Sequence, residues 1–94
     1  MNEKGLYVRC TVSQGLFKAE YYVVVGTSSA FVAAETVRVA RELKNEQEVI
    51  EGSVLVYLIQ EDHKRDEALV ELPGEPVLGG LRTWVPRKLV ENYA

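Results

Sequence analysis

Near its C-terminus the chain reads Gly79-Gly80-Leu81-Arg82-Thr83-Trp84-Val85-Pro86-Arg87-Lys88-Leu89-Val90. The two glycines indicate a turn and the following residues a short strand, which Pro86 ends because proline has no N–H to donate to a sheet. A similar pattern occurs earlier, in Ser29-Ala30-Phe31-Val32-Ala33-Ala34-Glu35-Thr36-Val37. Both stretches run aromatic, Val, two variable positions, a charged residue, one variable position and Val. This echo concerns architecture and predicts two similar halves.

The two halves of the chain also contain similar sequence segments in the same order. The matched segments are Val8–Val12 with Leu55–Ile59, Glu20 with Glu67, and Phe31-Val32 with Trp84-Val85. An insertion around residues 73–80 accounts for the longer second half. We predict one domain over residues 1–94, with candidate half-repeats at 5–44 and 52–93. Chance similarity between two β-rich halves is the alternative.

Period-two patterns and β-branched runs predict a mostly β fold. Leu6–Val12 alternates, whereas Tyr21–Val25 and Val54–Ile59 are apolar on both faces. Residues 30–44 fit either a helix, from apolar steps of three and four, or strands, from their β-branched residues. Pro86 rules out a continuous helix in the matching segment, which favours strands. We predict a small barrel or sandwich of about six strands, with at most one helix within 30–46.

The segment Trp84-Val85-Pro86-Arg87-Lys88-Leu89-Val90 resembles the closing segment of SH3-like barrels, which has a strand, a Pro, one tight helical turn and a final Val-rich strand. Pro86 and Val90 carry the resemblance, which implies a small β-barrel. Leu89 stands where ligand-binding SH3 domains carry a Tyr. The resemblance therefore does not extend to a groove for proline-rich peptides.

Reactive and metal-binding side chains are sparse in this sequence. Cys10 alternates with two valines, so we predict a buried thiol, and the single His63 lies in a charged loop. A zinc centre needs several Cys or His ligands, and a nucleophilic Cys needs an exposed thiolate beside a base. We therefore predict no enzyme activity, no metal and no cofactor.

Composition and charge bear on location and partners. The net charge is −3, with 11 Lys and Arg against 14 Asp and Glu. The chain begins with polar residues, and no apolar run approaches the roughly 20 residues that span a bilayer, so we expect a cytoplasmic protein without a membrane segment. The charge argues against a nucleic-acid partner, because phosphate binding needs a concentrated basic face.

These observations favour a small interaction module that binds a protein partner or associates with itself as a weak homodimer. The two doubly apolar strands motivate the dimer, with Tyr22 and Val24 or Tyr57 and Ile59 on the shared surface. A barrel associated with nucleic acid is the alternative. We expect Trp84 and Phe31 to be buried core residues. Leu16 and Phe17, beside the turn glycine Gly15, are typical of a plug at the end of a barrel or sandwich, and an exposed anchor for a partner is the alternative. The candidate partner surface comprises Leu16, Phe17, Tyr22, Val24, Tyr57, Arg82, Arg87 and Lys88.

Overall fold

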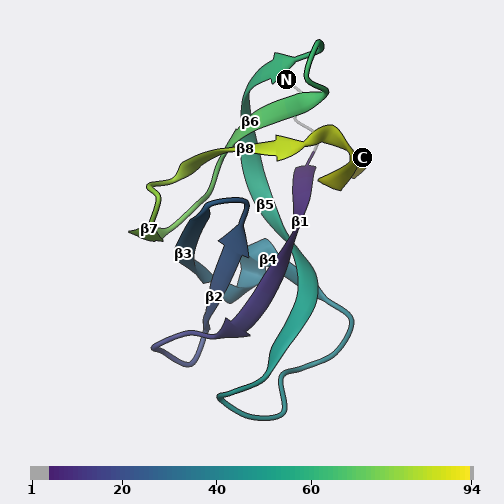
Figure 1. Ribbon diagram of the computed structural model, residues 1–94. Helices are drawn as coiled ribbons and strands as arrows, with labels where there is room; N and C mark the ends of the chain where they lie inside the picture. The colour runs from purple at the N-terminus through teal and green to yellow at the C-terminus, as the bar shows by residue number, and fades with distance from the viewer. Residues whose placement is uncertain (1–4, 94) are drawn as a thin grey trace.

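A computed structural model describes residues 5–93 of the chain (Figure 1). Within these residues it has nine strands, two 3-10 turns and no α-helix, and hence no helix long and apolar enough to cross a membrane. In chain order the elements are β1 (Gly5–Gln14), β2 (Glu20–Val25), β3 (Ser28–Ala33), η1 (Ala34–Thr36), β4 (Val37–Val39), β5 (Val49–Asp62), β6 (Glu67–Glu71), β7 (Glu75–Leu78), β8 (Arg82–Pro86), η2 (Arg87–Leu89) and β9 (Val90–Tyr93). The prediction of a mostly β fold is confirmed. The strands beyond the expected six are the short β4, β7 and β9.

All strands belong to one antiparallel sheet that curls into a half-barrel, in the order β7-β3-β2-β1-β5-β6-β8. The two longest strands, β1 and β5, pair along its centre, and each takes part in two lobes. The first lobe has the order β3-β2-β1-β5-β4 and the second the order β8-β6-β5-β1-β9. Figure 1 shows the first lobe below and the second above the crossing of β1 and β5. Two lobes in line give an elongated shape, 40 × 28 × 21 Å.

Both lobes close in the same way, with a strand, a 3-10 turn and a short strand that returns to the other lobe's long strand. Val37 at the start of β4 pairs with Val54, and Val90 at the start of β9 pairs with Val8. Val8 and Val54 also pair with each other. The pairing pattern therefore places Val8 and Val54 in equivalent positions at the centre of the sheet.

The structure makes Val8 equivalent to Val54, whereas the alignment of the two halves by sequence matched Val8 with Leu55, one residue further along. The β5–β6 pairing shifts between Leu58 and Gln60, so Ile59 is an extra residue in a β-bulge. Because a bulge adds one residue to one strand, it hides the true register from a comparison of sequences. Among the described residues β7 has no counterpart in the first lobe; it lies in the predicted insertion and pairs with β3.

The segment at residues 30–44, which fitted a helix or strands, forms β3, η1, β4 and the start of a loop. Six consecutive residues of β3 pair with β2, from Ser28 opposite Val25 to Ala33 opposite Glu20. β-Branched residues are restricted in helices and pack well in sheets, so the strand alternative prevails. The loop after β4 is held by Glu48, which accepts hydrogen bonds from Arg41 and from the Lys44 N–H.

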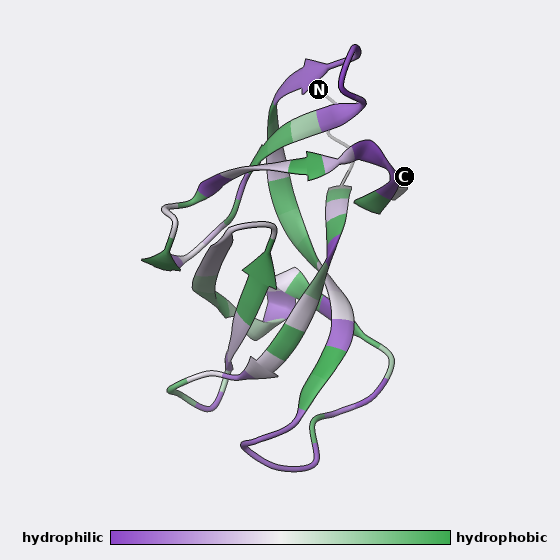
Figure 2. Cartoon of the chain, viewed as in Figure 1, coloured by the Kyte–Doolittle hydropathy of each residue, from purple (hydrophilic) through white to green (hydrophobic). Residues whose placement is uncertain are grey.

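Valines dominate the core, which lies on the inner side of the curled sheet. Cys10 is buried among them, as predicted. The prediction that Trp84 and Phe31 are core residues is wrong. Val85 and Val32 point inward and are buried, and since neighbours on a strand face opposite sides, Trp84 and Phe31 point outward. Figure 2 shows hydrophobic bands along the central strands and hydrophilic residues at the β5–β6 hairpin.

Candidate functional site

The tip of the β1–β2 hairpin holds two adjacent apolar side chains in solvent. Leu16 is 72% exposed and Phe17 71% exposed. Glu20 orders the turn: its Oε1 accepts hydrogen bonds from the Leu16 N–H at 2.8 Å and the Phe17 N–H at 3.3 Å. The Gly15 N–H donates to the Glu20 carbonyl at 3.1 Å. The turn is thus held by hydrogen bonds from three backbone N–H groups to Glu20, which leave both apolar side chains outside the core.

Glycine is required at position 15 because the chain passes so close to Glu20. A Cβ at Gly15 would lie 2.6 Å from the Glu20 carbonyl oxygen, well inside van der Waals contact. The pattern Gly15-Leu16-Phe17 followed by Glu20 therefore specifies a tight turn that presents the side chains at 16 and 17. From sequence alone the same pair also fitted a plug for the end of the barrel, which the structure does not show.

The other predicted surface residues lie on separate parts of the molecule. Tyr22 and Val24 share the outer face of the first lobe, where the Tyr22 ring lies 5.4 Å from that of Phe31. Tyr57, at 63% exposed, lies on the outer face of the second lobe. The basic residues sit on β8 and η2, where Arg82 pairs with Glu71 at 2.8 Å and Lys88 is exposed. The structure does not gather these residues into one surface.

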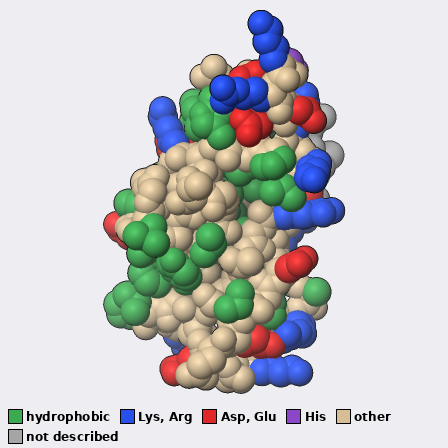
Figure 3. All heavy atoms as spheres, in the orientation of Figure 1, with side chains coloured by type: hydrophobic (Ala, Val, Ile, Leu, Met, Phe, Trp, Pro, Cys, Tyr) green, Lys and Arg blue, Asp and Glu red, His purple; other side chains and the backbone are tan. Residues whose placement is uncertain are grey.

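Trp84 extends the outer apolar face of the second lobe, although the sequence suggested a buried position. It is 41% exposed and lies directly opposite Leu69, in the row of the sheet that also contains Gln60. Further exposed apolar residues, Val77 and Leu78, lie on β7. Figure 3 shows hydrophobic side chains gathered from β7 over β3 and β2 toward the β1–β2 hairpin, and charged side chains at the end that carries the β5–β6 hairpin.

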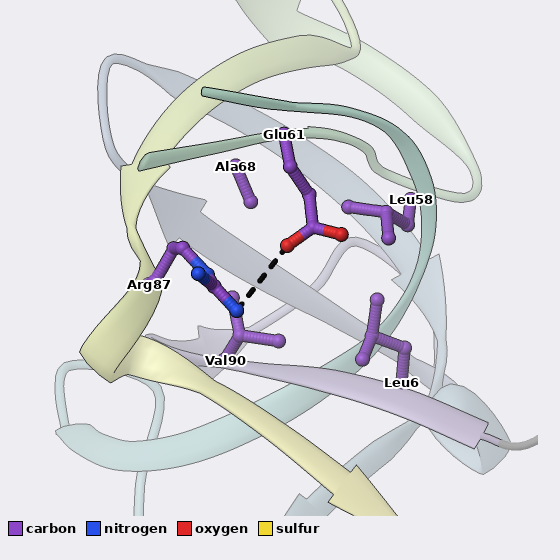
Figure 4. Close-up of a pocket in the computed structure, with 6 residues that line it drawn as sticks. All are labelled: Leu6, Leu58, Glu61, Ala68, Arg87 and Val90. Carbon is purple, nitrogen blue, oxygen red and sulfur yellow. Dashed lines mark ion pairs between the residues drawn. The ribbon is translucent and has the colours of Figure 1, made fainter. Parts of the chain in front are cut away.

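A pocket of about 300 Å³ opens at the end of the second lobe (Figure 4). Its lining comes from five elements and comprises Leu6 of β1, Leu58 and Glu61 of β5, Ala68 of β6, Arg87 of η2 and Val90 of β9. Four of the lining residues are apolar, and the other two form an ion pair between Arg87 Nη2 and Glu61 Oε1 at 3.3 Å. Arg87 Nη1 also lies 3.9 Å from Asp66 Oδ1 and 3.4 Å from His63 Nδ1.

Sequence analysis selected Arg87 of this pocket only as a basic surface residue and missed the other five. Its guanidinium is engaged by carboxylates of the β5–β6 hairpin, so the residue closes a corner of the lobe. The signal that could have found the pocket is Ala68, a small residue where the first lobe has Tyr21. The match of Glu20 with Glu67 already sets Tyr21 against Ala68 in sequence, and the strand pairings show that both positions face the interiors of their lobes.

Two ionisable groups away from the pocket have strongly shifted pKa values. Burial in the apolar core raises the pKa of the Cys10 thiol to about 12. The hydrogen bonds from Arg41 and from the Lys44 N–H lower the pKa of Glu48 to about 2. The first shift keeps the thiol protonated and weakly nucleophilic at neutral pH, and the second keeps the loop carboxylate ionised.

Comparisons of this chain with protein-family models, with curated proteins and with solved structures found no match.

Proposed function

We propose that this chain is a small β interaction module without catalytic activity, and that its β1–β2 hairpin tip inserts Leu16 and Phe17 into an apolar pocket of a protein partner. One observation carries the proposal: two adjacent large apolar side chains, each more than 70% exposed, stand on a turn that Glu20 orders. Contiguous apolar side chains left exposed to solvent are typical of interaction sites.

The energetics of burial support a role in binding. Burying one Leu or Phe side chain is worth about 1.5–3 kcal/mol, so the pair offers roughly 3–6 kcal/mol to a partner. Because the Glu20 carboxylate already holds the backbone of the tip, little conformational entropy is lost when the tip docks. An ordered apolar tip therefore suits recognition by insertion.

The strand, Pro86, 3-10 turn and strand at the C-terminus support an SH3-like small barrel, since a single 3-10 turn joins the last two strands in the order that the resemblance implies. The first lobe closes in the same way at η1, which supports the proposed internal repeat of 5–44 and 52–93. A reducing compartment such as the cytoplasm suits the single buried thiol.

The test compares capture of partners from the source cell by the parent chain and by the double variant Leu16→Ser/Phe17→Ser. Leu78→Ser is the matched control, since Leu78 is 65% exposed on a different element. For a purified partner we expect the double variant to bind about 100-fold or more weakly, from the loss of about 3 kcal/mol of burial, and the control to bind like the parent. Equal binding by the double variant would reject the tip as the contact.

Self-association is the second candidate, and the outer face of the second lobe favours it. Tyr57 and Trp84 are exposed there, and Leu69 lies beside Trp84. This face is more exposed than the alternative at Tyr22, whose ring packs on Phe31. Sedimentation should show a dimer at high concentration that Trp84→Lys removes, because position 84 lies opposite Leu69 and an unpaired charge in an apolar interface is costly. A monomer mass up to near-millimolar concentration would reject it.

Binding to nucleic acid has weaker support, because the candidate basic residues are largely neutralised. Arg82 pairs with Glu71, and Arg87 lies near Glu61 and Asp66. Phosphate contacts need cations whose charge is available to the backbone. We therefore favour a protein partner.

A further inference from the structure

The pocket of the second lobe occupies a position that an aromatic ring fills in the first lobe. The strand pairings make Ala68 the counterpart of Tyr21. Tyr21 lies between Gln14 of β1 and Val32 of β3, and Ala68 lies between Glu61 of β5 and Val85 of β8. Val32 and Val85 are both buried, so position 21 and position 68 face the interiors of their lobes.

Because position 68 carries no ring, the nearby inward-facing residue Leu58 is more exposed than its counterpart in the first lobe. Val12 of the first lobe pairs with Val23 and is fully buried. Its counterpart Leu58 pairs with Val70 in the same way, yet Leu58 is 45% exposed. An inward-facing leucine at a matching register position should be covered, so this exposure marks interior space that residues 5–93 leave open.

One exchange in the second lobe partly compensates for the missing ring. Leu6 lies where the first lobe has Gly52, at which a Cβ would come within 2.7 Å of the Arg38 carbonyl oxygen and 2.9 Å of Val12 Cγ2. The first lobe thus has a large side chain at position 21 and no side chain at position 52. The second lobe has a small side chain at the matching position 68 and a leucine at position 6. A pocket of about 300 Å³ still remains, which is at the lower end of the roughly 300–1,000 Å³ of ligand sites and suits a single ring.

We propose that this pocket binds one tyrosine side chain of a partner polypeptide, at a site separate from the hairpin tip. The internal precedent is Tyr21, a ring carried by a strand, in the equivalent position. The mouth is suited to a phenol: the Glu61 carboxylate can accept a hydrogen bond from its hydroxyl, and the Arg87 guanidinium can lie against the ring (Figure 4). An aliphatic side chain would gain neither of these contacts with the Glu61–Arg87 ion pair.

The test follows the methyl NMR signals of Leu6, Leu58, Ala68 and Val90 while p-cresol or the capped tripeptide Gly-Tyr-Gly is added to the full chain. We expect saturable shifts of these methyl groups with a dissociation constant on the order of 1 mM, and weaker shifts with the capped tripeptide Gly-Leu-Gly. Ala68→Tyr should abolish the shifts by filling the pocket. Ala33→Tyr is the control, because Ala33 is exposed and lies outside the pocket.

Several results would overturn the proposal. These are unchanged methyl signals, equal responses to the Tyr and Leu tripeptides, or a response to p-cresol without one to the Tyr tripeptide, which would indicate a free phenol as ligand. A dimer lost in both Ala68→Tyr and Phe17→Ser would make Phe17 of a second copy the occupant. Failure of the hairpin tip alone, with p-cresol binding kept in Leu16→Ser/Phe17→Ser, would reject the proposed function and leave this site intact.

Discussion

Removal of the Tyr21 ring should leave a space in the first lobe like the pocket of the second lobe, and it should lower the free energy of unfolding by a measurable amount. Tyr21 is half-buried against the core, and Val12 beneath it is fully buried. A tyrosine buries at most about 150–250 Å², so truncation removes roughly 100 Å² of apolar burial, worth about 2.5 kcal/mol at 25 cal/mol per Å². Gly52 offers no side chain to refill the space, so we expect Tyr21→Ala to cost about 3 kcal/mol.

Urea denaturation followed by circular dichroism gives the free energy of unfolding, with Tyr22→Ala as the matched control. Tyr22 is also half-buried but faces outward, and its ring packs on Phe31, so its removal should cost about 1 kcal/mol. p-Cresol should partly restore the stability of Tyr21→Ala and leave that of Tyr22→Ala unchanged. Equal costs for the two variants, or a cost below about 1 kcal/mol for Tyr21→Ala, would refute the equivalence between Tyr21 and the open space above Ala68.

The remaining predictions concern single residues. Trp84→Ala should cost less than about 2 kcal/mol in urea denaturation, because the side chain is 41% exposed; the 3–5 kcal/mol of a buried large aromatic would contradict its outward position. The Cys10 thiol should react slowly with a disulfide reagent at pH 8 and rapidly in urea. Since burial raises its pKa from 9.0 to about 12, its contribution to stability is complete below pH 9 and is lost as the pH rises toward 12. Glu48 should titrate near pH 2 by NMR; because its pKa is lowered from 4.5, its contribution is present above pH 4.5 and is lost as the pH falls through about 2. Glu48→Gln should abolish this acid-side dependence, and an ordinary titration near pH 4.5 would show that the Arg41 contact does not persist in solution.

Local patterns in the sequence were sufficient for most of the fold. Alternation predicted β1, the run Val54–Ile59 lies within β5, and Pro86 correctly marked the end of a strand before a tight turn. The side of the sheet to which each side chain points was harder to predict. Trp84 and Val85 are adjacent, only one can face the core, and the larger residue was the wrong choice because the curved interior holds β-branched side chains.

The candidate sites depended on features that the sequence shows only in part. Leu16 and Phe17 were recognised as a plug or a partner contact, and the choice between them rests on the hydrogen bonds of Glu20. The pocket also depends on the match of Val12 with Leu58, which the bulge at Ile59 shifts by one residue relative to the alignment made on sequence. Its lining joins both ends of the chain, Leu6 and Val90, which come together only through the pairing of β1 with β9.

The most direct test of the hairpin tip as a partner contact is site-specific crosslinking from position 17. Phe17 is replaced by the photoreactive p-benzoylphenylalanine, and the same replacement at Leu78, which is 65% exposed on β7, serves as the reference. We predict one dominant protein adduct from position 17 in the source cell, absent from position 78 and lost when Leu16→Ser is added. The same adducts from both positions, or an adduct from position 17 that survives Leu16→Ser, would contradict insertion of the tip into a partner.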